Sequence, residues 1–309
     1  MRKNAMKLPG SILLLIASMI WGAAFVAQSL GADNVYPFTF NASRSIVGAL
    51  VLVPVFLLMD RKNPGERKKN YRLLLLGGAG CGVLLFIACN LQQFGISYVD
   101  TSAEAAEAIE KANVGKVGFL TALYIVLVPV FGVFLGRRVG YPVWISVLIA
   151  LLGMYLLCIK PGFTVGASDI YAILCAVAFA MQILLVDAVA PKVDPIRLSC
   201  VQFAVCGAIS LICALITENP SMTDVIKAWA PILFTGVLSS GVAYTLQIVG
   251  QLRCRSEVAS LVMSLESVFS ALFGFLILGQ AMSAREFTGC AVMFAAVVLA
   301  QLPIGRNKA

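Results

Sequence analysis

Residues 11–30 read SILLLIASMIWGAAFVAQSL, a run of twenty residues without a charged side chain. An α-helix needs about 20 predominantly apolar residues to cross the hydrocarbon core of a bilayer, which is roughly 30 Å thick. The basic residues before the run resemble the start of a signal peptide. Cleavage after Ala27, however, would place Phe25 where a small residue is preferred. We therefore predict a retained transmembrane helix here.

The rest of the chain has the same character. Of its 309 residues, 60% are hydrophobic and 12% are charged, and its mean hydropathy is +0.94. Soluble domains are typically about 45–50% apolar and roughly 25% charged. Nine further apolar runs follow the first, at residues 38–59, 73–98, 117–136, 141–159, 168–189, 196–216, 229–251, 257–278 and 286–305. The fold class that we predict is an all-α integral membrane protein with ten transmembrane helices.

Positive charges in the connecting segments predict the orientation, because cytoplasmic loops carry an excess of Lys and Arg. With the first residue inside, the inner segments hold seventeen of these residues and the outer segments hold five. Both termini are therefore predicted to be cytoplasmic. The net charge of +8 lies in these short segments, with no basic face interleaved with aromatic residues, so we expect no nucleic-acid partner. Contact with anionic membrane lipid is expected instead.

The two halves of the chain resemble each other at an offset near 158 residues. The matching features are Val35-Tyr36-Pro37-Phe38 with Val193-Asp194-Pro195-Ile196, Asn63-Pro64 with Asn219-Pro220, Gly82 with Gly241, and Gly136 with Gly279. We predict two five-helix repeats, at 11–160 and 166–305. Because five is an odd number, the repeats should be inverted with respect to each other. The offset is smaller for the last pair, Gly136 and Gly279, than for the other pairs. The first repeat therefore carries an extra segment near 100–116, which we predict to be a short helix on the outer surface.

Two charged side chains inside the predicted spans are candidates for function. A charge at the centre of a transmembrane helix costs roughly 2.5–3.5 kcal/mol on insertion scales. Glu266 lies near the middle of the ninth span, and Arg44 lies about two turns into the second. We hypothesise that both face a central cavity and bind or gate a substrate. The alternative is a structural ion pair or a polar tie between helices.

Amide and aromatic residues in the spans complete the candidate site. Tyr244, Gln247 and Gln251 share one face of the eighth span, since they lie three to four residues apart. The residues that we predict for substrate binding or gating are Trp21, Arg44, Asn90, Gln93, Tyr124, Tyr244, Gln247 and Glu266. The wider set of polar cavity candidates adds Gln28, Asn41, Gln92, Gln182, Gln202 and Gln251.

Small residues cluster in two corresponding spans. Residues 77–82 of the third span read GGAGCG, and the eighth span contains Gly236, Ser239, Ser240 and Gly241. Interrupted helices in matching positions point to a transporter binding site. Small residues also allow two helices to pack closely. The sequence leaves both interpretations open.

Four motifs, in this order, resemble one family. They are IWGAAF at 20–25, Pro37 followed by Arg44, GFLTALY at 118–124 running to Pro129, and LESVF at 265–269 running to Gly279. Together they resemble the EamA-like branch of the drug/metabolite transporter superfamily, over nearly the whole chain. The resemblance implies ten helices, cytoplasmic termini, alternating access, and export of amino acids or related metabolites. It places Trp21, Arg44 and Glu266 in the core of the repeats.

Two features depart from the family pattern. Gln280 stands where an acidic residue commonly follows the glycine after the ninth span, so no role for that carboxylate carries over. The extra segment near Glu104–Asn113 is also unusual. As localisation, we expect the plasma (cytoplasmic) membrane, the inner membrane of a bacterial cell.

Secondary transport of a small-molecule substrate is the function that these features favour. The chain has no histidine, no CxxC pair and no GxxxxGK[ST] phosphate loop, so we expect no metal, no cofactor and no ATP hydrolysis. A proton-coupled mechanism would need a titrating group, for which Glu266 is the first candidate and Asp187, near the inner end of the sixth span, is the second. The alternatives are an intramembrane enzyme and a passive channel or assembly subunit. The sequence also leaves the choice between a monomer and a homodimer open.

Overall fold

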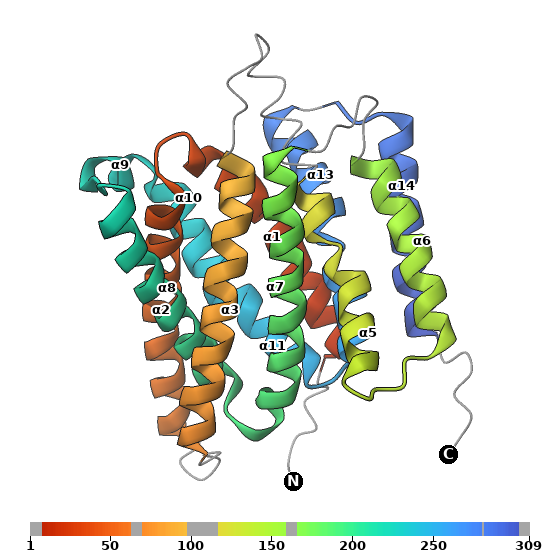
Figure 1. The fold of residues 1–309 in the computed structure, drawn as a ribbon, viewed down its shortest axis with the longest axis horizontal. Helices are drawn as coiled ribbons and strands as arrows, with labels where there is room; N and C mark the ends of the chain where they lie inside the picture. Colours follow the sequence, from red (N-terminus) through yellow and green to blue (C-terminus); the bar gives the residue numbers. More distant parts are fainter. Residues whose placement is uncertain (1–7, 63–69, 98–116, 159–165, 280, 303–309) are drawn as a thin grey trace.

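We analysed a computed structural model of the chain, which describes residues 8–62, 70–97, 117–158, 166–279 and 281–302. Ten helical segments are long and apolar enough to cross a membrane (Figure 1). They are Gly10–Ala32, Pro37–Arg61, Tyr71–Ser97, Val117–Phe134, Tyr141–Cys158, Ser168–Lys192, Pro195–Thr217, Trp229–Gln251, Ser256–Ile277 and Ala284–Gln301. The prediction of an all-α protein with ten transmembrane helices is confirmed, and the protein is a multi-pass membrane protein.

Seven of the described spans contain one long helix each. These helices are α1 (Gly10–Ala32), α2 (Pro37–Lys62), α3 (Tyr71–Ser97), α6 (Tyr141–Cys158), α7 (Ala167–Val189, extended by the 3₁₀ turn η1, Ala190–Lys192), α8 (Pro195–Thr217) and α14 (Ala284–Gln301). The pair α2 and α8 forms one flank of the molecule, and the pair α6 and α14 forms the other (Figure 1).

The other three spans are divided. The fourth span has a helical turn at 117–121 and then α5 (Tyr124–Phe134). The eighth span consists of α10 (Trp229–Leu233), the π-helix η2 (Phe234–Ala243) and α11 (Tyr244–Gln251), preceded by the short helix α9 (Met222–Lys227). The ninth span consists of α12 (Ser256–Met263) and α13 (Glu266–Leu278). Helices of membrane proteins are commonly divided where they line a site.

The two clusters of small residues differ in structure. Helix α3 runs without a break through its glycines, and a Cβ atom at Gly82 would lie 2.7 Å from the carbonyl oxygen of Gln202. Close packing is therefore the role of this cluster. In the eighth span the cluster lies in the π-helix η2, and a Cβ atom at Gly236 would lie 2.9 Å from the carbonyl oxygen of Arg44. There, close packing on α2 accompanies an irregular helix. The predicted outer helix near 100–116 lies outside the described residues, and so does Gln280.

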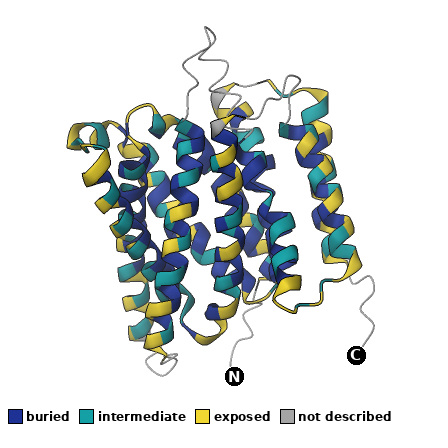
Figure 2. Ribbon diagram, viewed as in Figure 1, coloured by how far each residue is buried: buried dark blue, intermediate teal, exposed yellow. Residues whose placement is uncertain are grey.

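The outer surface of the bundle is apolar. Exposed residues lie on the outside and buried residues fill the interior (Figure 2). Large aliphatic side chains such as Leu50, Leu76 and Leu148 are 63%, 65% and 66% exposed. Water-soluble proteins rarely expose extended apolar patches. A lipid environment satisfies these side chains, in agreement with the ten spans.

Helices α2 and α8 are connected at both ends by hydrogen bonds or an ion pair. The carboxylate of Glu218, just after α8, accepts hydrogen bonds from the backbone nitrogens of Phe38 and Thr39 at 2.8 and 2.7 Å. At the other end, Arg197 of α8 forms an ion pair with Asp60 of α2. Thr39 and Arg197 lie 158 positions apart in the chain, and so do Asp60 and Glu218. Each helix thus carries an acidic group at its carboxyl end that binds the first turn of the other.

Gly136 lies just after α5 and forms part of its C-terminal cap. Its φ of +78° is a left-handed conformation, which glycine adopts without steric cost. The nitrogens of Gly136 and Arg137 donate to the carbonyl oxygens of Val133 and Gly132, both at 2.9 Å. This pair of bonds is a Schellman motif. Gly279, with a φ of +64°, ends α13 in the same conformation.

Glycines allow the backbones of helices α6 and α14 to approach each other closely. This contact leads to a prediction about stability. A Cβ atom at Gly289 would lie 2.7 Å from both the carbonyl oxygen of Gly153 and the nitrogen of Leu157. Backbone atoms cannot rotate away as side chains do, so the helices would have to separate. We expect Gly289→Ala to lower the free energy of unfolding by about 1–3 kcal/mol. A thermal melt of the purified protein measures this change. The control is Gly166→Ala, whose Cβ would meet nothing within 4 Å, and an equal loss in both variants would contradict the prediction.

Candidate substrate cavity

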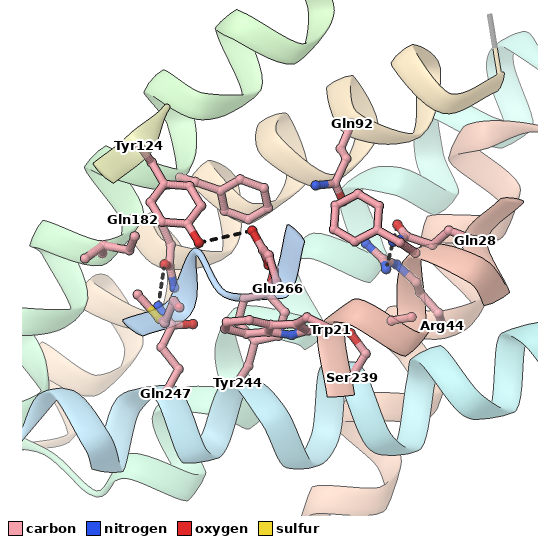
Figure 3. Close-up of a pocket in the computed structure, with 15 residues that line it drawn as sticks. Trp21, Gln28, Arg44, Gln92, Tyr124, Gln182, Ser239, Tyr244, Gln247 and Glu266 are labelled. Carbon is pink, nitrogen blue, oxygen red and sulfur yellow. Dashed lines mark hydrogen bonds between the residues drawn. The ribbon is translucent and has the colours of Figure 1, made fainter. Parts of the chain in front are cut away.

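A cavity lies at the centre of the bundle, between the two halves of the chain (Figure 3). Its volume is about 40 Å³, which is room for only roughly three water molecules. Its lining is mainly polar and aromatic. The labelled residues in Figure 3 are Trp21, Gln28, Arg44, Gln92, Tyr124, Gln182, Ser239, Tyr244, Gln247 and Glu266. The small volume means that the helices must move apart before a metabolite can enter.

The breaks in the fourth and ninth spans meet at this cavity. Tyr124 is the first residue of α5 and Glu266 is the first residue of α13. The hydroxyl of Tyr124 donates a hydrogen bond of 3.0 Å to the carboxylate of Glu266. Both breaks are turns with i→i−3 bonds, such as the 3.2 Å bonds that the nitrogens of Leu123 and Leu265 donate. The two divided helices therefore present their first side chains to the same point.

Glu266 has no cationic partner in the part of the chain that the structure describes. Its side chain is 7% exposed, and among the described residues it takes part in no ion pair. The only hydrogen bond that it receives there comes from neutral Tyr124. A carboxylate at the amino end of a helix is favourable, because the helix dipole is positive at that end. The carboxyl group is nevertheless left available to a ligand in the cavity.

Arg44 is buried without an anionic partner. It is 4% exposed, and its Nη1 donates to Oε1 of Gln28 at 3.2 Å. Its guanidinium carbon lies 5.9 Å from the centroid of the Phe40 ring. The Nε atom has no hydrogen-bond partner, and no carboxylate of the described residues pairs with the side chain. Buried charges are normally paired. This guanidinium therefore has the free capacity to bind an anion.

An aromatic wall borders the cavity, with Trp21 and Tyr244 below Glu266 and Tyr124 above it in the view of Figure 3. The rings of Trp21 and Tyr244 are in edge contact at 4.8 Å, and Tyr244 contacts Phe203 at 5.0 Å. On the other side, Tyr124 contacts Phe179 at 6.5 Å. The indole nitrogen of Trp21 is buried and has no acceptor among the described residues. The wall thus offers an apolar surface with one free donor.

A chain of buried glutamines, which we call the glutamine ladder (Gln182, Gln202, Gln247 and Gln251), leads away from the cavity. Gln182 donates to Gln202 at 3.3 Å, and Gln247 donates to both Gln182 and Gln251 at 3.1 Å. Gln251 then donates to the carbonyl oxygen of Ile183 at 3.0 Å. Gln182 and Gln247 line the cavity, whereas Gln251 does not.

A second, larger cavity, which we call the vestibule, lies at the end of the bundle where α1 begins and α14 ends. Its volume is about 930 Å³, and both Leu8 and Leu302 line it. Arg137 reaches across its wall, with an ion pair to Asp187 of α7 at 2.6 Å and a hydrogen bond to Ser256 of α12 at 2.9 Å. Asp187 therefore belongs to the vestibule and not to the central cavity.

Six of the eight predicted site residues line the central cavity: Trp21, Arg44, Tyr124, Tyr244, Gln247 and Glu266. The other two lie outside it. Asn90 connects three helices, through bonds to Asn41 at 3.1 Å and to Ser210 at 3.1 Å. Gln93 is fully buried and donates to the carbonyl oxygen of Gln28 at 3.3 Å. Both amides satisfy neighbouring helices instead of facing the cavity.

The structure adds cavity residues that the predicted site lacks. Gln28, Gln92 and Gln182 belong to the wider set of polar candidates, and their polarity inside apolar spans is the signal that marks them. Ser239 lies in the cluster of small residues in the eighth span. Apolar lining residues such as Phe179 and Met263 carry no such signal. In the described ranges, no group of three or more His, Cys, Asp or Glu residues is placed to hold a metal ion.

Comparisons with known proteins agree with this architecture. The model of the EamA-like transporter family matches residues 8–159 and again residues 166–302. An uncharacterized transporter of Archaeoglobus fulgidus is 26% identical over 94% of this chain and 85% of its own length. The uncharacterized transporter YoaV of Bacillus subtilis is 21% identical over 96% of this chain and 97% of its own length.

Two further matches are a plant protein and a solved structure. A chloroplastic WAT1-related protein of Arabidopsis thaliana is 23% identical over 96% of this chain and 70% of its own length. A solved crystal structure superposes with a TM-score of 0.75, covering 97% of this chain and 99% of the other at 18% identity, which supports the fold. The two family matches cover most of the chain. The protein is therefore a membrane transporter that belongs to the EamA-like transporter family.

Proposed function

We propose that the protein is a secondary carrier that exports small zwitterionic metabolites, amino acids or related compounds, by alternating access. The observation that carries this proposal is the pair of buried charges in one cavity. Among the described residues, Arg44 has no anionic partner and Glu266 has no cationic partner, although both line the same space. A ligand with a carboxylate and an ammonium group would complement both. The aromatic wall of the same cavity would contact its apolar part.

The predicted orientation and repeats belong to the same proposal. Two inverted repeats in the plasma membrane, with both termini in the cytoplasm, would place the vestibule on the cytoplasmic side. The reciprocal ties between α2 and α8, which repeat at the same offset in the chain, support this arrangement. The breaks at Tyr124 and Glu266 support alternating access, because divided helices at the midplane are where such carriers bind their substrates.

Competition in proteoliposomes tests the substrate class. We expect saturable uptake from a pool of labelled amino acids, and we expect unlabelled zwitterions to compete with it. Analogues that lack either the carboxylate or the ammonium group should compete at least about tenfold less, because each would leave one buried charge without a partner. Equal competition by all three classes would contradict the two-charge site. Flux that never saturates would favour a passive channel.

A further inference from the structure

The central cavity and the vestibule are separated by a thin layer of protein. Along α11, Gln247 lines the cavity and Gln251 lines the vestibule. These residues are four positions apart, which is about one helical turn, or roughly 5.4 Å along the axis. Their side chains bond directly to each other at 3.1 Å. One layer of hydrogen-bonded amides therefore spans the distance between the two spaces.

Two other helices pass through the same layer. Helix α7 lines the cavity with Gln182 and Ile183 and lines the vestibule with Asp187. Helix α12 faces the vestibule with Glu257, while Met263, at its other end, lines the cavity. Between these levels the helices contribute mainly buried aliphatic side chains, namely Leu184, Val186, Ile248, Leu261 and Val262. The glutamine ladder is therefore the polar part of an otherwise apolar layer between the central cavity and the vestibule.

We propose that the glutamine ladder is the gate and the polar passage between the central cavity and the vestibule. This inference rests on the proposed function only in that the permeating molecule is polar. Amides carry no net charge, so they can bind both ends of a zwitterion without trapping either one. The ladder also holds spare capacity, since Oε1 of Gln247 and Nε2 of Gln202 have no partner among the described residues. Bonds can therefore be exchanged with a passing ligand.

Opening the gate requires α7 and α11 to separate. The bonds from Gln247 to Gln182 and from Gln251 to the carbonyl oxygen of Ile183 connect these two helices. Arg137 holds the rim of the same layer from the other half of the chain, through Asp187 and Ser256. The ladder closes the passage, and the rim contacts hold the helices that carry it.

The test measures how easily a solute reaches the cavity. The chain has three tryptophans, and replacing Trp144 and Trp229 by phenylalanine leaves Trp21, in the cavity wall, as the single fluorophore. Acrylamide, a small neutral amide, is the quencher. Gln251→Ala removes one step of the ladder and should raise the quenching constant at least about two-fold, because quenching follows the population of open passages. Gln251→Leu fills the same space and should cause no rise.

Gln301→Ala is the matched control. Gln301 also lines the vestibule, but its amide donates only to the carbonyl oxygen of Val297 in its own helix. An equal rise in Gln301→Ala, or no rise in Gln251→Ala, would overturn the proposal. If Gln251→Ala is not monodisperse, Gln251→Ser carries the test. The readout needs no substrate, so a carrier that moves none of the pooled amino acids would refute the proposed function and leave this result intact.

Discussion

Arg44→Gln is expected to lower saturable amino-acid uptake by about 30- to 3,000-fold, because losing one partner of a desolvated charge pair costs about 2–5 kcal/mol. The neutral amide can keep a hydrogen bond to Gln28, which is the only polar contact of the guanidinium in the described structure. It cannot supply the positive charge that would bind a substrate carboxylate. Initial rates in proteoliposomes over a range of substrate concentrations measure the loss.

The same variant separates a binding role from a structural role. Arg44 pairs with no described carboxylate, so its replacement leaves no buried anion behind, and the melting temperature should stay close to that of the original protein. Arg285→Gln is the control. Arg285 packs over the ring of Tyr155 at 5.2 Å, away from the cavity, and its loss should leave uptake unchanged. A large fall in the melting temperature of Arg44→Gln, with uptake preserved, would make Arg44 structural.

Glu266→Gln is expected to lower both net uptake and the exchange of internal for external substrate by about 30-fold or more, because it also removes one partner of a desolvated charge pair. Among the described residues that line the cavity, Glu266 is the only acidic one. Its carboxylate would bind the substrate ammonium, and in a proton-coupled mechanism it would hold a proton when the carrier is empty. Uptake with and without an imposed pH gradient, and exchange without a gradient, are the measurements.

Each pattern of these rates has a separate meaning. Exchange that survives in Glu266→Gln while gradient-driven uptake is lost would limit Glu266 to proton coupling and would contradict its contact with substrate. Uptake by the original protein that ignores the pH gradient would remove the proton from the cycle. Asp224→Asn, on the exposed surface helix α9, is the control for removal of a carboxylate and should match the original protein.

Hydropathy was sufficient to predict the ten spans, because the length and polarity of each run decide whether a helix can cross a bilayer. The breaks at Leu123 and Leu265 were not predictable in the same way. No glycine or proline stands at either break, and the residues there are ordinary helix formers or serine. The residues at the two breaks carry no local signal for a turn, so the turns could be located only in the structure.

The site residues divide on similar grounds. Arg44 and Glu266 were predictable because a charge inside a span needs a reason to be there. Polarity alone does not say whether a buried amide faces a cavity or a neighbouring helix. Asn90 binds Ser210 and does not line the central cavity. The glutamine ladder could be identified only from the structure. Its members lie on three helices, and only their spacing in three dimensions connects them.

The contact of Glu218 with the start of α2 has a consequence for biosynthesis. The amide groups of Phe38 and Thr39 obtain their acceptor from a residue 179 to 180 positions later in the chain. At synthesis rates of about 5–20 residues per second, roughly 9–36 s pass between the emergence of the two segments from the ribosome. During that interval these two amide groups lack the acceptor that they have in the folded protein. The first turn of α2 can therefore reach its final hydrogen bonding only after α8 has been synthesised.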